Sequence, residues 1–466
     1  MCPFLRIMKK IMEIVRKLVQ RIQTSGFLKS VLTLSSGVIV GQAINFLGMP
    51  VVGRVYTPTA MGDYTLITAN SAIISAFVCL GMMTTFLLPK ENEEARGLTK
   101  LVTASTVLLT TVVIGVLWAC SGVFQIFHTE EVSYGVSLMV LWLYIVTSTI
   151  SNICYAYVNR QKLYRVMFWN PIITAVINVV VGVVLGLLGW GFLGYTAAHI
   201  LSYLVNILHL AIHANPFAKV TNPEYRGIAL LKSYRRFPLY QMPANLIANM
   251  SSQLPVNMIE ALYSATELGL YSMAMRILAL PSTLLATPIN RVFFQEASER
   301  YNRGENIGDF CYKILSTNIK IAVIPISILI LFGEPIFAIF LGEQWKEAGF
   351  YAAIMGVYQM MLFCASCLSG HFVIIKKSHW NLISAIAGLV LCVSLFFFCK
   401  FVATISIVEY LALLSLLMTV KLIAEQSALF VHLKFSLVKY LLLILKWVVL
   451  PCGISLAITW LLRAQL

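Results

Sequence analysis

Long apolar segments follow one another along almost the whole chain, with short polar gaps between them. Thirteen are long enough to cross a bilayer, because about 20 helical residues span roughly 30 Å of hydrocarbon. Their approximate ranges are 30–52, 64–88, 101–127, 132–158, 166–188, 191–212, 238–260, 268–290, 313–333, 348–374, 379–399, 403–431 and 440–462. With 59% hydrophobic and 11% charged residues, the chain cannot fold around one soluble core. Such runs are helices rather than barrel strands, so the sequence predicts an all-α polytopic membrane protein.

A nine-residue motif recurs in two of the polar gaps. Residues 56–64 read Tyr-Thr-Pro-Thr-Ala-Met-Gly-Asp-Tyr, and residues 263–271, 207 positions later, read Tyr-Ser-Ala-Thr-Glu-Leu-Gly-Leu-Tyr. Many transporters repeat several helices in the same order and place a substrate site between the two copies. The motif therefore predicts two six-helix bundles related by a parallel pseudo-two-fold repeat around a central cavity, plus an extra C-terminal helix.

The spans and the repeat divide the chain into five predicted parts. We expect a basic amphipathic helix in the membrane interface at 1–29, an N-terminal six-helix bundle at 30–213, a cytoplasmic linker at 214–237, a C-terminal six-helix bundle at 238–431 and an additional helix at 432–466. The first span is expected to act as an uncleaved membrane anchor.

Basic residues alternate between the two sides of the predicted membrane. Most of the 34 Lys and Arg residues fall before the first span or in every second gap after it. The other side holds Arg54, Lys346, Lys400 and Arg463. Because short cytoplasmic loops are rich in Lys and Arg, this distribution predicts a cytoplasmic N-terminus. The net charge of +15 is then explained by loops that face anionic lipid, and no nucleic-acid partner is expected.

Arg276 is the most informative polar residue within the spans, since it lies near the middle of the eighth one. An Arg at that depth costs at least about 2.5 to 3.5 kcal/mol unless it meets water, a partner or an anionic ligand. Ser272, Thr283 and Thr287 fall on the same helical face, which favours a polar cavity beside it. The alternative is an ion pair with a carboxylate of another helix, and the conceivable partners are Glu260 and Glu409.

Five amide side chains recur at every fourth residue of the seventh span. They are Gln241, Asn245, Asn249, Gln253 and Asn257. A column of carboxamides suits a hydroxyl-rich ligand or a water-filled cavity, and the alternative is that these side chains join neighbouring helices. The repeat offset places Gln42 of the first span on the position of Asn249, so the opening helices of both halves carry an amide at matching depth.

The positions of three further basic residues, Arg54, Lys320 and Lys421, predict a role for each. Arg54 flanks the first outer gap, where it caps a helix end in one interpretation and meets the head group in the other, and Lys320 lies in the inner half of the ninth span. Both belong to the predicted substrate site beside Arg276. Lys320 has a second interpretation, in which its charge reaches the membrane surface. Lys421 and Glu425 lie four residues apart and are expected to pair with each other.

No metal, cofactor or catalytic site is predicted. Cys364 and Cys367 have the spacing of a metal knuckle, but no second pair accompanies them and their span is apolar. His199, His209 and His213 have no carboxylate arranged for a proton relay. A phosphate-binding loop that ends in Gly-Lys-Ser/Thr is missing from the sequence, and the outer gaps are short for a membrane glycosyltransferase or polymerase.

The sequence resembles the oligosaccharide and polysaccharide flippases of the multidrug/oligosaccharidyl-lipid/polysaccharide exporter superfamily, up to about residue 430. The resemblance is carried by Gly37-Val38-Ile39-Val40-Gly41-Gln42, Pro50, Arg54-Val55-Tyr56-Thr57-Pro58, Gly62, Tyr64, Leu88-Pro89-Lys90, Gly269-Leu270-Tyr271, Arg276 and Pro281. It implies two six-helix bundles whose central cavity opens alternately to each side of a prokaryotic cytoplasmic membrane. The thirteenth span departs from a plain twelve-helix plan.

The expected function is the transfer of a polyprenyl-pyrophosphate-linked oligosaccharide to the outer leaflet, with a polysaccharide polymerase and export machinery as partners. Arg276, with Arg54 and Lys320, would hold the diphosphate, while Gln42 and the amide column contact the sugars. One alternative is a cation-coupled multidrug exporter of the same superfamily, which would need a buried acid that none of the first six predicted spans contains. A membrane glycosyltransferase or polymerase is a more distant alternative.

Overall fold

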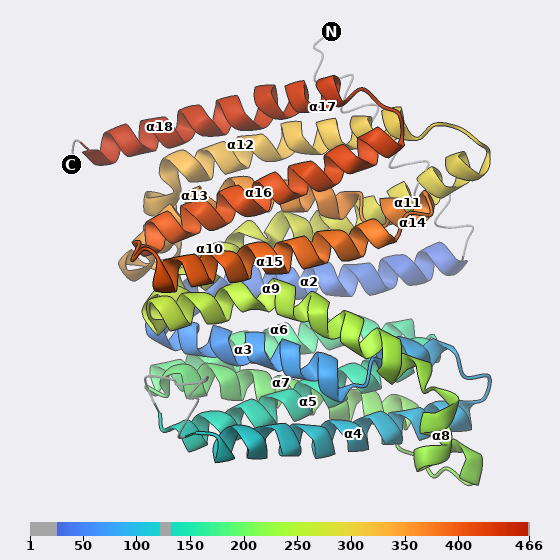
Figure 1. Ribbon diagram of the computed structural model, residues 1–466. Coiled ribbons are helices and arrows are strands. Elements are labelled where there is room, and N and C mark those ends of the chain that lie inside the picture. The colour runs from blue at the N-terminus through green and yellow to red at the C-terminus, as the bar shows by residue number, and fades with distance from the viewer. Residues whose placement is uncertain (1–25, 122–131, 465–466) are drawn as a thin grey trace.

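The computed structural model describes residues 26–121 and 132–464, and this part of the chain folds into helices joined by short loops. The interfacial helix predicted at 1–29 lies outside the described residues except for its last four, which begin the first described helix. The predicted all-α polytopic architecture is confirmed, and the helices run roughly side by side in Figure 1. The five domain boundaries stay predictions.

The first half contains six long helices, in the order of the predicted spans. They are α2 (Gly26–Val55), α3 (Pro58–Val78), α4 (Asn92–Ala119), α5 (Tyr134–Arg160), α6 (Tyr164–Leu187) and α7 (Gly191–Ala214), with the 3₁₀ turn η1 (Met82–Leu87) after α3. The predicted linker contains η2 (Pro223–Tyr225) and the short helix α8 (Gly227–Ser233). Within this half, α6 packs against α2 and α7, and α5 packs against α3, α4 and α7.

The second half repeats this plan, but several of its crossings are interrupted. Its elements are η3 (Phe237–Gln241), α9 (Met242–Leu262), α10 (Ala265–Leu278), η4 (Ser282–Ala286), α11 (Thr287–Asn302), α12 (Gly308–Leu341), η5 (Glu343–Trp345), α13 (Lys346–Cys367), α14 (His371–Ile374), α15 (His379–Phe401) and α16 (Ile407–His432). The additional helix consists of α17 (Leu437–Ile444), η6 (Leu445–Val449) and α18 (Leu450–Ala464), and it packs along α12 at the edge of the molecule (Figure 1).

Two of the helices differ from the others in composition. Among the described residues, eleven helical segments are long and apolar enough to cross a membrane, and α3 and α9 are not among them. Both are 21 residues long, but α3 carries hydroxyl and amide side chains and α9 carries four of the five residues of the predicted amide column. These two helices pack against each other, and α3 also packs against α10. The polar helices therefore lie where the two halves of the repeat meet.

The repeated motif forms the crossing of α3 and α10. Thr57 caps the start of α3 and Ser264 caps the start of α10, so equivalent residues begin both helices. A Cβ at Gly62 would collide with the carbonyl oxygen of Ala265, and a Cβ at Gly269 would collide with that of Pro58. The repeat offset of 207 relates Gly62 to Gly269 and Pro58 to Ala265, so each of the two contacts is the symmetry equivalent of the other. The crossing therefore lies on the predicted pseudo-two-fold axis.

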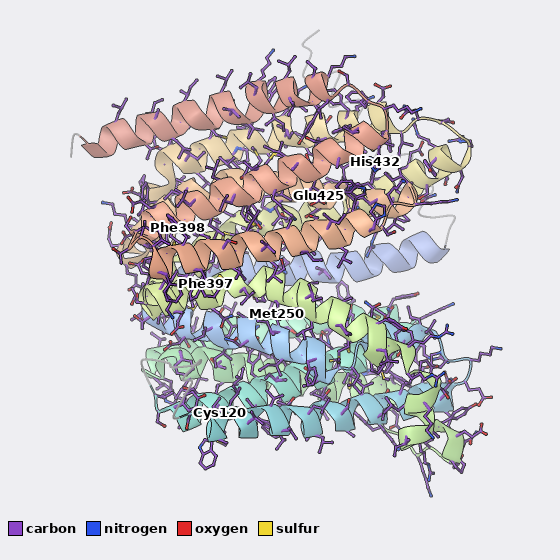
Figure 2. All side chains as sticks on the ribbon, in the orientation of Figure 1. Cys120, Met250, Phe397, Phe398, Glu425 and His432 are labelled. Atoms are coloured by element: carbon purple, nitrogen blue, oxygen red, sulfur yellow. The ribbon has the colours of Figure 1, made fainter. Side chains whose placement is uncertain are left out.

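Apolar side chains cover much of the outer surface. Phe397 and Phe398 near the end of α15 are 53% and 43% exposed, and they lie close to the end of the helix bundle (Figure 2). An exposed apolar surface of this kind is expected when lipid is the solvent.

Candidate functional site

Arg276 lies in the last turn of α10, where the negative end of the helix dipole favours a cation. Pro281 and the π-helical turn η4 interrupt the eighth crossing directly after this helix. A Cβ at Gly62 or Gly269 would meet the partner helix, so the crossing brings α10 very close to α3 one turn or more before Arg276. The sequence of this segment thus places the charge of Arg276 at the C-terminal end of α10, a helix of the second half that packs against α3 of the first half.

Arg276 borders a cavity of about 320 Å³ that lies between the two halves of the repeat. Four helices of the first half line it, α2, α3, α6 and α7, and they face α10 and η4 of the second half. Gln42 of α2, Asn178 of α6 and Thr283 of η4 supply polar groups. The Oδ1 atom of Asn178 is buried and, within the described part of the chain, accepts no hydrogen bond.

Two tyrosine rings hold the Arg276 guanidinium. Its Cζ atom lies 5.1 Å from the ring centroid of Tyr64 and 5.9 Å from that of Tyr195. Nη1 is also 3.5 Å from the Tyr195 hydroxyl. His199 packs against both rings, with centroid distances of 4.8 and 4.7 Å. Because a guanidinium has five N–H donors, most of them remain for a ligand in this cavity.

The predicted alternative for Arg276, an ion pair with a carboxylate, is not found. Among the residues that the structure describes, Arg276 forms an ion pair with neither Glu260 nor Glu409. Glu409 instead accepts hydrogen bonds from the backbone N–H and the hydroxyl of Ser406 and caps the start of α16. The charge of Arg276 is therefore shared with aromatic faces and is open to an anion.

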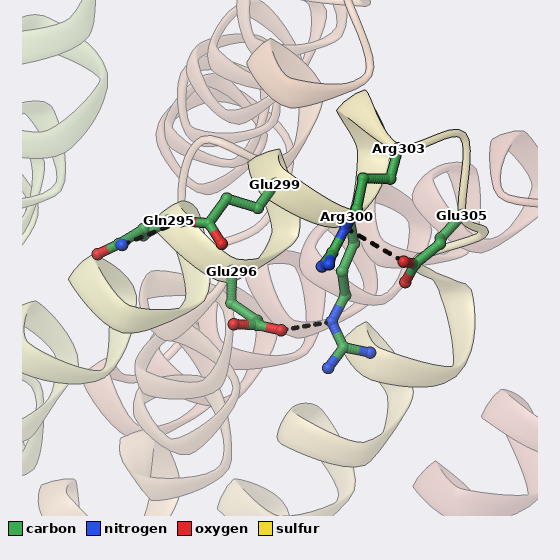
Figure 3. Close-up of polar contacts among 6 residues, drawn as sticks. All are labelled: Gln295, Glu296, Glu299, Arg300, Arg303 and Glu305. Carbon is green, nitrogen blue, oxygen red and sulfur yellow. Dashed lines mark hydrogen bonds and ion pairs between the residues drawn. The ribbon is translucent and has the colours of Figure 1, made fainter.

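Charge pairs occur elsewhere in the described chain. Near the end of α11, Arg300 pairs with Glu296 and Arg303 pairs with Glu305 (Figure 3), and their N–O distances are 2.7 and 3.2 Å. The predicted pair of Lys421 Nζ with Glu425 is confirmed at 3.3 Å in α16. These cations are neutralised locally, in contrast to Arg276.

The amide column does not share the cavity of Arg276. Gln241 Nε2 donates to Asn245 Oδ1 at 2.9 Å, so the column is continuous at its first step. Asn245 and Asn249 line a second cavity, between α9 and helices α3, α5 and α7. Gln253 and Asn257 line neither cavity, although Asn257 donates to the Gln253 carbonyl.

Four other predicted site residues do not line the Arg276 cavity. Arg54 donates to the carbonyl oxygens of Pro50 and Ile339, where α2 meets α12. Lys320 is exposed, and its Nζ lies 5.5 Å from the ring of Trp447 in the additional helix. Ser272 is buried and donates its hydroxyl to the carbonyl oxygen of Gly269. Thr287 is exposed at the start of α11. Of the predicted set, Arg276, Gln42 and Thr283 come together.

The sequence reasoning missed the tyrosines and the histidine of this site. Tyr195, His199 and Tyr203 recur at every fourth residue of α7, so they lie on one face of an otherwise apolar helix. That spacing was the available signal. The sequence shows no carboxylate for a proton relay beside His199, and the spacing alone does not reveal that these rings pack around a guanidinium.

Asp63 is a buried acid in the first half, where none was expected within the spans. The predicted second span begins at 64, but α3 begins at Pro58, because Thr57 provides a cap and Pro58 suits the first helical position. Asp63 is therefore inside the helix and fully buried. The first half thus contains a buried acid, contrary to the expectation from the apolar runs.

The family of the chain follows from a comparison with known protein families. The model of a family described as polysaccharide biosynthesis protein matches residues 51–350, which is more than half of the chain. The chain belongs to this family. A relative, the succinoglycan biosynthesis transport protein ExoT of Rhizobium meliloti (strain 1021), is 20% identical over 311 residues. That match covers 66% of this chain and 60% of the relative's length.

Solved structures show the same fold. The lipid II flippase MurJ in an inward closed conformation superposes with a TM-score of 0.69 at 13% identity, covering 91% of this chain and 93% of that one. A transporter of the MOP superfamily from Pyrococcus furiosus gives a TM-score of 0.52 at 15% identity, covering 87% and 96%. These similarities show that the chain shares the two-lobed fold of these membrane proteins.

Proposed function

We propose that this protein is a flippase that moves a polyprenyl-pyrophosphate-linked oligosaccharide from the cytoplasmic to the outer leaflet by alternating access. Such a head group cannot cross hydrocarbon unaided, because each unbonded hydroxyl costs on the order of 4 to 8 kcal/mol in an apolar medium and a diphosphate costs far more. A polar cavity between two lobes provides the missing hydrogen bonds and charge. The family match to a polysaccharide biosynthesis protein supports this class of substrate.

The observation that carries the proposal is the guanidinium of Arg276 in the interlobe cavity. It contacts the rings of Tyr64 and Tyr195 and, within the described residues, forms no ion pair. A diphosphate accepts the paired N–H donors of a guanidinium in a fork geometry. We assign Arg276 to the diphosphate, with Gln42 and Thr283 as neutral neighbours, and we leave Arg54 and Lys320 out of this site.

The proposal includes an orientation and partners. We place the protein in the cytoplasmic membrane of a prokaryote with its N-terminus inside, as the distribution of Lys and Arg predicts. A polysaccharide polymerase and export machinery would then receive the head group at the outer face. The polyprenyl tail would stay in the bilayer while the head group passes between the lobes.

The test is transport of a radiolabelled polyprenyl-pyrophosphate oligosaccharide in liposomes that contain the purified protein. Arg276→Ala should lower the rate by about 10-fold or more, because hydrogen bonds to a charged group contribute about 1.5 to 3 kcal/mol. Lys320→Ala removes a cation of the same membrane region that lies outside the cavity, and it should leave the rate unchanged. Transport by Arg276→Ala at the wild-type rate would refute the assignment.

Cation-coupled drug export is a second candidate, and the buried Asp63 favours it. Coupling by proton or sodium exchange needs an acid within a membrane helix, which Asp63 supplies in α3. Cells that express Asp63→Asn should lose resistance to cationic drugs if this function holds. Unchanged drug resistance together with loss of surface glycan would favour the flippase.

A further inference from the structure

The second cavity has a different chemical character from the cavity of Arg276. Its volume is about 380 Å³, near the lower end of the roughly 300 to 1,000 Å³ typical of small-molecule sites. Hydroxyl and amide groups dominate its polar lining, among them Ser71, Ser75, Ser148, Thr149 and Asn152. Within the described chain, its lining residues include no Lys, Arg, Asp or Glu. The cavity is therefore polar but uncharged.

Its polar groups come from both halves of the protein. Ser75 of α3 and Thr149 of α5 share a hydrogen bond of 3.0 Å between their hydroxyls. Across from them, Asn245 of α9 accepts a hydrogen bond through Oδ1, and no described residue accepts one from its Nδ2, which is left to donate. Asn249 donates through Nδ2 to the Asn245 carbonyl, and its Oδ1, to which no described residue donates, is left to accept. Donors and acceptors side by side match the hydroxyl groups of a sugar, each of which both donates and accepts.

Three tyrosines connect the two cavities. Tyr64 lines the Arg276 cavity, and its ring lies 6.4 Å from that of Tyr144, which lines the second cavity. The Tyr144 hydroxyl lies 3.2 Å from that of Tyr203, which also lines the second cavity. The anion site and the uncharged cavity are thus separated by a single aromatic contact. A ligand whose charged and uncharged parts are directly linked fits this arrangement.

We infer that the second cavity binds an uncharged sugar of the head group while Arg276 holds the diphosphate. This inference rests on the proposed function. A uronic acid or another anionic sugar in the same place would exchange part of its hydration for uncharged groups without meeting a cation among the cavity's lining residues, which is unfavourable. The protein therefore selects lipid-linked oligosaccharides whose sugar next to the diphosphate is neutral.

The test compares two polyprenyl-pyrophosphate substrates in the same liposomes, one with glucose and the other with glucuronic acid attached to the diphosphate. The wild-type protein should transport the glucose substrate at least about tenfold faster. Equal rates would overturn the inference and leave the flippase function standing. If the protein transports neither substrate and also does not transport the lipid-linked precursor of the native glycan, the inference and the proposed flippase function are both overturned.

A charge variant provides an independent measurement. Asn152 of α5 is exposed to the cavity, so Asn152→Lys adds a cation there. It should raise transport of the glucuronic acid substrate and lower that of the glucose substrate. Asn302→Lys, at an exposed amide at the end of α11, is the matched control and should change neither rate. Membrane content and a monodisperse elution profile establish that both variants fold, and an unchanged ratio of rates in folded Asn152→Lys would contradict the inference.

Discussion

Thr59 and Thr266, which occupy equivalent positions 207 residues apart, share a hydrogen bond of 2.7 Å between their side-chain hydroxyls. The bond joins the start of α3 to the start of α10, at the end of the helices that the charge distribution predicts to be external. Gly62 and Gly269 allow the two backbones to touch beside it. In alternating access, this crossing would have to separate when the cavity opens to the outside.

Replacing both hydroxyls by cysteine should lock the crossing. In Thr59→Cys/Thr266→Cys the two sulfurs would lie close enough for a disulfide, whose S–S length is about 2.05 Å. We expect oxidation to stop transport in liposomes and a reductant to restore it. Each single variant should be insensitive to oxidant, and transport by the oxidised double variant would show that the crossing does not need to open.

Gly62→Ala or Gly269→Ala should weaken the closed crossing, because the added methyl group meets a backbone carbonyl that cannot move aside easily. Overpacking of this kind costs typically about 1 to 3 kcal/mol. The thermal unfolding temperature in detergent should fall. Gly115→Ala in α4 is the control, since nothing lies within 4 Å of its added Cβ. Equal unfolding temperatures for all three variants would contradict the close approach.

Tyr64 should act through its ring rather than its hydroxyl. Removal of the ring in Tyr64→Ala takes away a cation–π contact worth about 0.5 to 2 kcal/mol, so binding of inorganic pyrophosphate should weaken by roughly two- to thirtyfold. Tyr64→Phe retains the ring and should bind nearly as the wild type does. Calorimetry on the purified protein measures both, and a loss in Tyr64→Phe equal to that in Tyr64→Ala would assign the effect to the hydroxyl.

Arg54→Ala should change the balance between the conformations of the protein without changing its affinity for pyrophosphate. The Arg54 side chain donates to Ile339 O at 3.0 Å, and Gln344 Nε2 donates to Tyr56 O nearby, also at 3.0 Å, so these residues join the halves near the crossing. Loss of a hydrogen bond worth about 0.5 to 1.5 kcal/mol should raise the population of the state open to the outside. Spin-label distances between α3 and α10 measure that population.

Pyrophosphate affinity is the complementary measurement for Arg54→Ala. We expect it to remain at the wild-type value, because the structure places Arg54 outside the Arg276 cavity. Arg276→Ala should show the reverse pattern, with weak binding and unchanged distances. A loss of pyrophosphate binding in Arg54→Ala would restore the role that the sequence predicted for this residue.

Hydropathy and the repeat were sufficient to predict the helices and the pseudo-symmetric halves, and the cost of a buried charge was sufficient to single out Arg276. They could not predict which neighbour each helical face meets. The amide column and Arg276 lie on consecutive crossings, and α3 of the other half packs against both helices, yet Asn245 and Asn249 of the column border a different cavity from that of Arg276. Periodicity assigns residues to a face, whereas only tertiary packing decides what lies opposite that face.

The boundary of α3 shows the same limit at a local scale. An apolar run marks where hydrocarbon begins, while a cap and a proline mark where the helix begins, and here the two differ by six residues. Asp63 lies in that interval, so hydropathy alone places it in a loop. A search for caps in advance of each apolar run would have placed it inside the helix.

The polar composition of α3 and α9 has a consequence for biogenesis. A translocon releases a nascent segment into lipid according to its hydrophobicity, and neither helix reaches the level of the other crossings. We expect each to depend on neighbours that shield its hydroxyls and amides: α3 packs against α5, α7, α9 and α10, and α9 packs against α3 and α15. The second crossing thus completes its contacts with the second half only after the ribosome has added some two hundred further residues, up to α10, and truncated chains that end before α9 should leave it less stable in the bilayer.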